Sequence, residues 1–464
     1  MVTLRRPAPG APLSDQIAIT RTVTVAAGRF APGHLGELTR LIPFEMVDDV
    51  LADTASVQRR VRILPARVVV YLLLAGCLFT ELGYRQVWQR LTSGLRMLAV
   101  AQPTASALRQ ARQRLGPAPL RALFDLLRGP AATTMTTAVT WRGMLLTAID
   151  GTILTVADSP ANLAVYTKQR GNNGGSGYPQ IRLSAMLTCG TRSIIDAVFD
   201  PATTGEIAQA HRLTRALKPG MLLLADRNYA AADLVTAFAA TGADLLIRCK
   251  TGRRLPILAR HHDGSYRSLL GGVTIRVIEA HIHIRTSAGH RTGTYRLITT
   301  LLDSRRYPAT ELITLYHQRW NIETAYLELK SSILTGHVLR ARTPTGLSQE
   351  IYALLIVYQI LRTAMVDATD SIDGLDPDRA SFTTALNAAR DQLIHAAGII
   401  TDTTVDLVGT IGRHILDNLM PNRRVRTKPR TIKRANSKYQ ARGPRIDRTT
   451  YKATISIDIL DNSP

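Results

Sequence analysis

One stretch in the second half of the chain, Tyr316-His-Gln-Arg-Trp-Asn-Ile-Glu-Thr-Ala-Tyr-Leu-Glu-Leu-Lys330, contains strong helix-forming residues and no internal Gly or Pro. It predicts a helix in which each residue turns by about 100°. Tyr316, Glu323 and Lys330 then lie almost in one line, and Arg319 lies about 40° from Glu323. A phenol, a guanidinium, a carboxylate and an ammonium thus share one stripe. A neighbouring apolar stripe can anchor the helix to a core, and it comprises Leu315, Ile322 and Leu329.

Two acidic residues upstream decide between a functional site and a solvated helix face. The spacing of the cation and the carboxylate on the helix is equally typical of an exposed i, i+4 ion pair. Asp150 and Asp226, however, each close an apolar run that is typical of a buried strand, Met144–Ile149 and Met221–Ala225. A buried carboxylate is costly unless it is paired or binds a metal. Either Asp alone could be a helix cap or a turn residue, but both together with Glu323 predict a site.

The same residues resemble a known signature, that of the insertion-sequence-four (IS4) family of bacterial DDE transposases. Tyr316-x-x-Arg319-x-x-x-Glu323-x-x-x-x-x-x-Lys330 is similar to the Y-(2)-R-(3)-E-(6)-K motif of that family. Ile149-Asp150-Gly151-Thr152 resembles the segment with the first catalytic Asp. Ala225-Asp226-Arg227-Asn228-Tyr229 resembles the second, where Gly is more usual at the position of Asn228. The resemblance runs from about Met144 to Arg342 and extends more weakly to the segment Leu38–Phe44.

This resemblance implies a DNA transposase that releases DNA 3′ ends at the termini of an insertion element and joins them to target DNA. Two divalent ions about 3.5–4 Å apart can activate the attacking oxygen and stabilise the leaving one. Mg²⁺ prefers oxygen ligands, and Mn²⁺ can substitute. The expected metal ligands and catalytic residues are Asp150, Asp226 and Glu323. The residues expected to hold the DNA phosphate are Tyr316, Arg319 and Lys330.

Other functions stay open at the level of sequence. A related nuclease or integrase would cut DNA without joining ends. A non-catalytic DNA-binding protein derived from a transposase would bind without cutting, although all three acids are present. Synapsis of two element ends implies at least a homodimer. End sequence, target preference and the use of a hairpin intermediate cannot be predicted from the residues.

Composition and charge support a nucleic-acid partner. The chain has 464 residues, 45% of them hydrophobic and 20% charged, which is typical of a globular protein with two or three domains. Its net charge of +23 favours a polyanionic partner, nucleic acid first and an anionic membrane second.

Three cysteines form neither a metal-spaced cluster nor a disulfide framework. The apolar runs Val68–Thr80 and Ile351–Leu361 are shorter than the roughly 20 residues that span a bilayer. We therefore expect a cytoplasmic, nucleoid-associated protein and no membrane partner.

The predicted fold class is α/β, with a ribonuclease-H-like mixed-sheet catalytic core. An α-helical N-terminal domain precedes the core along the chain, and C-terminal helices follow it. The expected parts are a flexible arm (1–34), a helical N-terminal domain expected to contact DNA (35–135), the DDE core (136–345) with a β-rich insertion at about 250–300, C-terminal helices (346–420) and a basic tail (421–464).

Several further features have both a functional and a purely structural interpretation. The Arg-rich helix 104–115 and the helix that follows it, 117–127, could form a unit that contacts DNA phosphates, or an ordinary helical hairpin. The glycines of 171–177 favour a flexible loop over a phosphate-binding loop. His281 and His283 are more typical of surface histidines than of a metal pair. The basic tail is expected to be disordered alone and to bind phosphates. Acids that we place outside the site are Asp158, Asp196, Asp200, Glu206 and Glu328.

Overall fold

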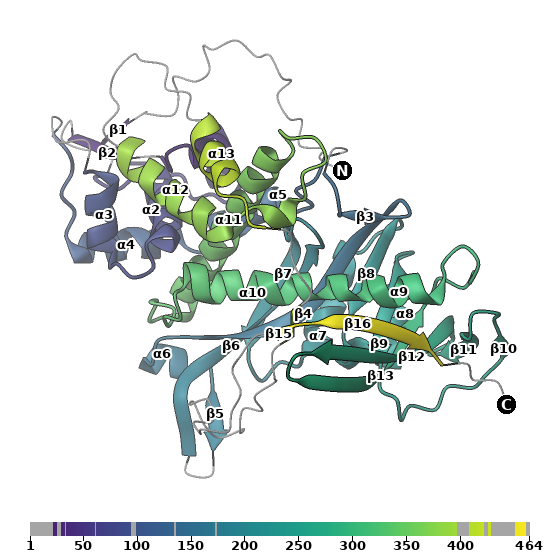
Figure 1. The fold of residues 1–464 in the computed structure, drawn as a ribbon. Coiled ribbons are helices and arrows are strands. Elements are labelled where there is room, and N and C mark those ends of the chain that lie inside the picture. Colours follow the sequence, from purple (N-terminus) through teal and green to yellow (C-terminus); the bar gives the residue numbers. More distant parts are fainter. Residues whose placement is uncertain are drawn as a thin grey trace.

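A computed structural model gives the fold of residues 22–25, 29–32, 34–60, 62–93, 99–133, 136–171, 174–396, 408–421, 426–427 and 451–460. A large mixed sheet forms the centre of the protein, and a layer of helices covers one end of it (Figure 1). The predicted flexible arm, residues 1–34, lies mostly outside the described residues.

The core of the sheet has the strand order β7-β6-β4-β8-β9. Strand β4 pairs antiparallel with β6 and parallel with β8, and β8 pairs parallel with β9. Three antiparallel strands, β4, β6 and β7, are thus followed along the chain by two strands parallel to β4. This is the ribonuclease-H-like arrangement that the sequence predicted. The strands are β4 (Met144–Thr155), β6 (Gly174–Thr188), β7 (Ile194–Pro201), β8 (Met221–Ala225) and β9 (Asp244–Cys249).

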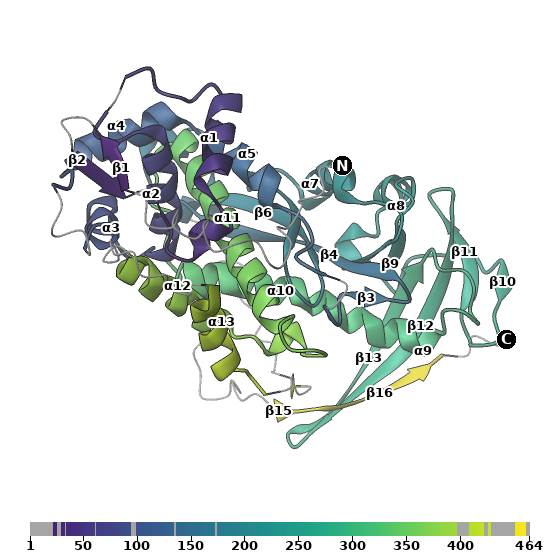
Figure 2. The same cartoon turned by 90° about the horizontal axis from the view of Figure 1, so that it is seen from above.

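Both faces of this sheet are buried, because alternate residues of each central strand belong to different hydrophobic clusters. In β8, Leu222 and Leu224 pack in the cluster that includes helices α9–α11. Leu223 and Ala225 pack in the second cluster, with α7 and α8. Figures 1 and 2 show the long α9–α10 rod crossing one face of the sheet, away from α7 and α8. The helices are α7 (Glu206–Leu213), α8 (Ala232–Ala239), α9 (Ala309–Tyr316) and α10 (Trp320–Leu327).

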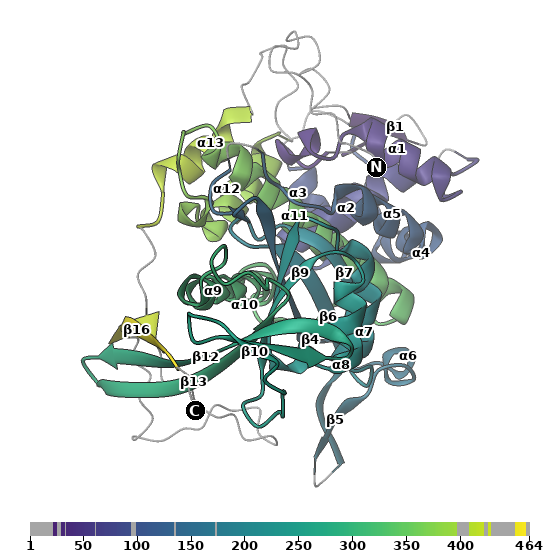
Figure 3. The same ribbon diagram turned by 90° about the vertical axis from the view of Figure 1, so that its right-hand side faces the viewer.

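The segment between β9 and α9 extends the sheet with further antiparallel strands. They are β10 (Ala259–Arg260), β11 (Tyr266–Leu270), β12 (Val273–Thr286) and β13 (Gly289–Thr299). Strand β13 joins them to β9. The C-terminal strand β16 (Thr454–Ile459) pairs with β12, so the end of the chain returns to the edge of this sheet (Figure 3). The sequence did not predict β16, and most of the basic tail, 422–425 and 428–450, lies outside the described residues.

Helices from both ends of the chain pack together. Helix α11 (Pro344–Thr369) contacts α2 and α5 from the N-terminal side and α12 and α13 from the C-terminal side. The remaining helices of this layer are α1 (Phe44–Asp53), α2 (Ala66–Leu78), α3 (Tyr84–Leu91), α4 (Ala105–Leu115), α5 (Ala118–Leu127), α12 (Phe382–Ala396) and α13 (Val408–Asp417). Helix α11 is long and apolar enough to cross a bilayer by length and composition, but 78% of its apolar window is buried inside the protein. Its apolar character therefore reflects a central position in the helical layer.

Two local predictions were wrong. The glycine stretch is not a free loop, because β5 (Lys168–Gly171) pairs with the start of β6 at Gly174. Strand pairing uses only backbone N–H and C=O groups, so glycines can take part in it. The stretch from Tyr316 to Lys330 is not one uniform α-helix either. A 3₁₀ turn, His317–Arg319, separates α9 from α10, and a π-helical turn, Glu328–Ile333, follows α10. We call the continuous rod 309–333 the signature helix.

Candidate active site at the sheet and signature helix

Strand register brings the two aspartates to the same place on the sheet. Ala148 of β4 lies opposite Leu224 of β8 in the parallel pairing. Asp150 and Asp226 each lie two residues further along, at equivalent positions on neighbouring strands that are about 4.8 Å apart. Asp150 does not close its strand as predicted, because β4 continues to Thr155 through its pairing with β6. Asp226 directly follows β8, and its carboxylate accepts a hydrogen bond from the Asn228 N–H at 2.8 Å.

Arg319 of the signature helix lies between the first aspartate and the helix glutamate. One guanidinium nitrogen is 3.0 Å from Glu323 Oε1, and another is 3.9 Å from Asp150 Oδ2. Arg319 is 8% exposed, and its buried Nε–H has no hydrogen-bond partner among the described residues. Glu323 is much more open, with 45% of its side chain exposed. The signature helix therefore places a cation and a carboxylate directly above the Asp150 strand.

The electrostatic environment of Asp150 is that of a crowded acidic site. The pKa of its carboxyl is raised to about 7. Burial is the largest cause, the Gly151 N–H and Arg319 oppose it, and the neighbouring carboxylates of Asp226 and Glu206 add to it. A nearby cation would relieve both the desolvation and the repulsion between like charges. The donor set itself consists of carboxylate oxygens, which are the ligands that hard divalent cations prefer.

The described residues do not already form a closed metal-binding cage. No group of three His, Cys, Asp or Glu side chains within them stands close enough to hold an ion in this arrangement. Arg319 is instead the shared partner of Asp150 and Glu323. The carboxylate donors on adjacent strands fit a divalent ion. For Asp150 and Glu323 to bind the same ion, Arg319 must first leave them and bind another anion.

Two tyrosines attach the signature helix to the strands that carry the aspartates. The Tyr316 hydroxyl donates to the Ala225 carbonyl at 3.0 Å, next to Asp226. The Tyr326 hydroxyl donates to the Asp150 carbonyl at 2.5 Å. Tyr316 is only 5% exposed and its hydroxyl faces the sheet. Its predicted contact with a DNA phosphate stays a prediction.

Lys330 lies beyond Glu323, at the π-helical turn. Its ammonium is exposed and is 3.4 Å from Thr152 Oγ1, on the same strand as Asp150. A π-turn closes i→i+5 hydrogen bonds, so it shifts the phase of the residues that follow it relative to a regular α-helix. Lys330 nevertheless remains over strand β4, on the side of the sheet where Asp150 and Arg319 lie.

Glu206, which the sequence analysis placed outside the site, lies near it, and its charge is one of those that raise the pKa of Asp150. Its carboxylate accepts from Arg182 at 2.8 Å and from the Asn228 amide at 3.4 Å. A Cβ added to Gly151 would stand 3.2 Å from Glu206 Oε1, so the glycine allows this close approach. No sequence signal predicted the contact, because it depends on how helix α7 returns across β4 and β6.

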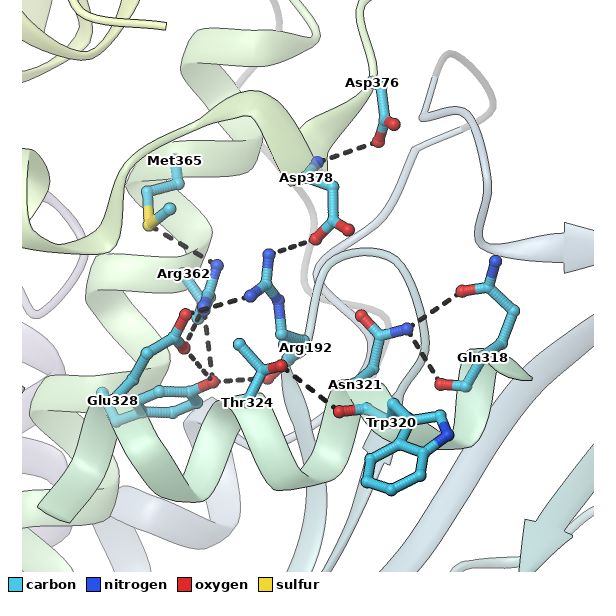
Figure 4. A network of polar contacts seen from close by, with 11 residues as sticks. Arg192, Gln318, Trp320, Asn321, Thr324, Glu328, Arg362, Met365, Asp376 and Asp378 are labelled. Atoms are coloured by element: carbon cyan, nitrogen blue, oxygen red, sulfur yellow. Dashed lines mark hydrogen bonds and ion pairs between the residues drawn. The ribbon is translucent and has the colours of Figure 1, made fainter. Parts of the chain in front are cut away.

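Glu328 belongs to a different, buried network on the opposite side of the signature helix, as its rotation away from Glu323 predicted. Its carboxylate pairs with Arg192 at 3.0 Å, with Arg362 of α11, and with the Tyr358 hydroxyl at 3.1 Å (Figure 4). Arg192 also pairs with Asp378. This network connects the π-helical turn to the sheet and to the helical layer.

The two histidines of β12 lie next to each other and contact residues of β13 and β16. His283 stacks on His290 with ring centroids 5.5 Å apart, and its Nε2 is 3.0 Å from Asp458 of β16. His281 hydrogen-bonds with Thr294 at 3.3 Å. These contacts favour a structural role at the sheet edge.

Replacing Arg319 with Lys is expected to reduce cleavage by about 10²-fold, in the range found when one preorganised donor to a reacting group is removed. A lysine keeps the charge but cannot reach two carboxylates or a phosphate with a planar fork of donors. Single-turnover cleavage of a DNA end at saturating protein measures the effect. Arg142→Lys is a suitable control, because that exposed arginine pairs with Glu311 and lies over the Trp141 ring, outside the proposed site. Equal rates for both variants would contradict the prediction.

Comparisons with known proteins identify the family. Residues 32–125 match the insertion element 4 transposase N-terminal family, and residues 141–360 match the transposase DDE domain. The chain is 25% identical over 414 residues to the transposase InsG for insertion sequence element IS4 of Escherichia coli (strain K12), covering 85% of this chain and 91% of InsG. A solved structure of the piggyBac transposase synaptic complex with hairpin DNA aligns over 87% of both chains, with a TM-score of 0.43 and 12% identity. The chain thus belongs to the IS4 family of DDE transposases and is a DNA-cleaving enzyme.

Proposed function

We propose that this transposase cleaves element ends and transfers them to target DNA at a site formed by Asp150, Asp226 and Glu323. One observation carries the proposal most strongly: register places the two aspartates at equivalent positions on adjacent strands, and Arg319 connects Asp150 to Glu323. This strand register and the two contacts of Arg319 support a site built from residues that are far apart in the sequence.

The family depends on a divalent metal, and we propose Mg²⁺, replaceable by Mn²⁺, with two ions bound. The ions would supply Lewis-acid activation of the attacking oxygen and stabilisation of the leaving oxygen. Asp150 and Asp226 are the fixed ligands, because backbone pairing holds both strands. Glu323 approaches from the signature helix. Its 45% exposed side chain has room to move toward the aspartates.

Arg319 and Lys330 are proposed to hold the reacting phosphate, and Tyr316 would join them only by giving up its hydrogen bond to the Ala225 carbonyl. Arg319 offers a buried Nε–H without a partner among the described residues, so it can bind an additional anion without losing an existing hydrogen bond at that atom. A phosphate entering beside Glu323 would draw the guanidinium away from the carboxylates and free them for metal. Lys330 would approach the same phosphate as a point charge.

DNA is the partner of this family, and the net charge of +23 suits it. We further propose a homodimer in the synaptic complex, a cytoplasmic, nucleoid-associated location, and DNA contacts by the N-terminal helices and the basic tail. The division into five parts at residues 34, 135, 345 and 420 also stays a proposal. In the structure, α11 packs with helices of both the N-terminal and the C-terminal part.

Cleavage and joining assays on DNA with the element's inverted repeats test the proposal. Full-length protein is expected to nick these ends with Mg²⁺ or Mn²⁺ and to join precleaved ends to a target plasmid. Titration of the DNA-bound protein with Mn²⁺ is expected to give two ions for each active site. Cutting without joining would favour a nuclease, and binding without cutting would favour a DNA-binding derivative.

A further inference from the structure

Tyr326 lies on α10, one turn beyond Glu323, and its hydroxyl bonds the backbone of two strands. It donates to the Asp150 carbonyl at 2.5 Å and accepts from the Ala185 N–H at 3.0 Å. Asp150 of β4 and Ala185 of β6 are partners in the antiparallel register. One phenol therefore joins the signature helix to the sheet at the residue that provides the first carboxylate.

This contact differs in kind from the charged contact between the helix and Asp150. Arg319 reaches the Asp150 carboxylate at 3.9 Å, and a phosphate or a metal ion would compete for the same groups. The Tyr326 hydroxyl bonds only backbone atoms, which neither ligand can displace. Tyr326 is 7% exposed, so water does not offer its partners an easy replacement.

We propose that Tyr326 is a positioning residue for the transposase reaction, in which its hydroxyl fixes the spacing between Asp150 on the sheet and Glu323 on the helix. The proposal rests on the proposed function, because it assumes that these carboxylates share a metal. Glu323 and Tyr326 are three residues apart on one helix, so holding the phenol also holds the carboxylate. Residues that orient metal ligands without touching the metal commonly affect metal affinity.

A Tyr326→Phe variant removes only the hydroxyl. It is expected to raise the Mn²⁺ concentration for half-saturation about tenfold or more, the lower end of the usual range for residues that orient metal ligands. Loss of the electron paramagnetic resonance signal of free Mn²⁺ measures this in the full-length protein bound to DNA. The Mg²⁺ concentration for half-maximal cleavage should rise in parallel.

Tyr71→Phe is the matched control. Tyr71 is also buried, and its hydroxyl donates to the Ile42 carbonyl at 2.8 Å, in the helical layer. It should lose a comparable amount of thermal stability and keep wild-type affinity for Mn²⁺. Equal Mn²⁺ affinity of Tyr326→Phe and Tyr71→Phe would overturn the positioning role, provided that Asp150→Asn still abolishes Mn²⁺ binding. If Asp150→Asn binds Mn²⁺ like the wild type, the proposed site is wrong and the positioning role falls with it.

Discussion

Asp150→Asn is expected to reduce Mg²⁺-dependent cleavage at element ends by about 10³-fold or more and to leave DNA binding unchanged. The amide keeps the size of the side chain but removes the charge that a divalent ion needs. Metal ions contribute several kcal/mol of charge stabilisation in such reactions, and each 1.4 kcal/mol corresponds to about tenfold in rate. Asp226→Asn and Glu323→Gln should have effects of the same order. Gel-shift titration and single-turnover cleavage separate binding from chemistry.

Asp158→Asn is the matched control for these variants. Asp158 lies just after the end of β4, and its 38% exposed carboxylate pairs with Lys168. The sequence analysis placed it outside the site. Its removal should leave the cleavage rate at the wild-type value. Retained cleavage by the Asp150, Asp226 or Glu323 variant would remove that residue from the proposed site.

The relation between the two aspartates could be predicted from the sequence because it depends on local pattern. Apolar runs before Asp150 and Asp226 indicate buried strands, and neighbouring parallel strands bring their corresponding positions together. The predicted strand and helix order likewise gives the ribonuclease-H-like sheet. The sequence pattern placed Arg319 and Glu323 on one helix face, and the structure has them 3.0 Å apart.

Other features depend on contacts that no local pattern contains. The π-helical turn begins at Glu328, whose carboxylate is paired with Arg192 from the β6–β7 turn and Arg362 from α11. Glu206 reaches the site only because α7 packs across the sheet. The strand β16 pairs with the second half of β12, beyond the part that pairs with β11, and its isoleucines pack against the core. In each case tertiary packing decides the outcome, so intrinsic propensity cannot predict it.

Glu328→Ala is expected to lower the free energy of unfolding by about 3–5 kcal/mol, the usual cost of removing one partner from a buried ion pair. Glu328 is 8% exposed, and its loss would leave Arg192 and Arg362 without their shared carboxylate. Urea unfolding measures the difference. Glu311→Ala is the control on the same rod, because its pair with Arg142 is exposed on both sides and should contribute less than about 1 kcal/mol. Similar losses for both variants would contradict the prediction.

The stability that Glu328 contributes should depend on pH in a defined direction. Burial alone would raise the pKa of the Glu328 carboxyl, but Arg362, Arg192 and the Tyr358 hydroxyl outweigh burial and hold the pKa below its ordinary value. Such a group stabilises the fold fully above the ordinary carboxyl pKa, and this contribution is lost as the pH falls through the lowered folded-state value. The stability difference between wild type and Glu328→Gln should therefore be constant near neutral pH and should shrink in acid. A difference that grows as the pH falls would show that the carboxyl is protonated in the folded protein and that the two arginines are held by other groups.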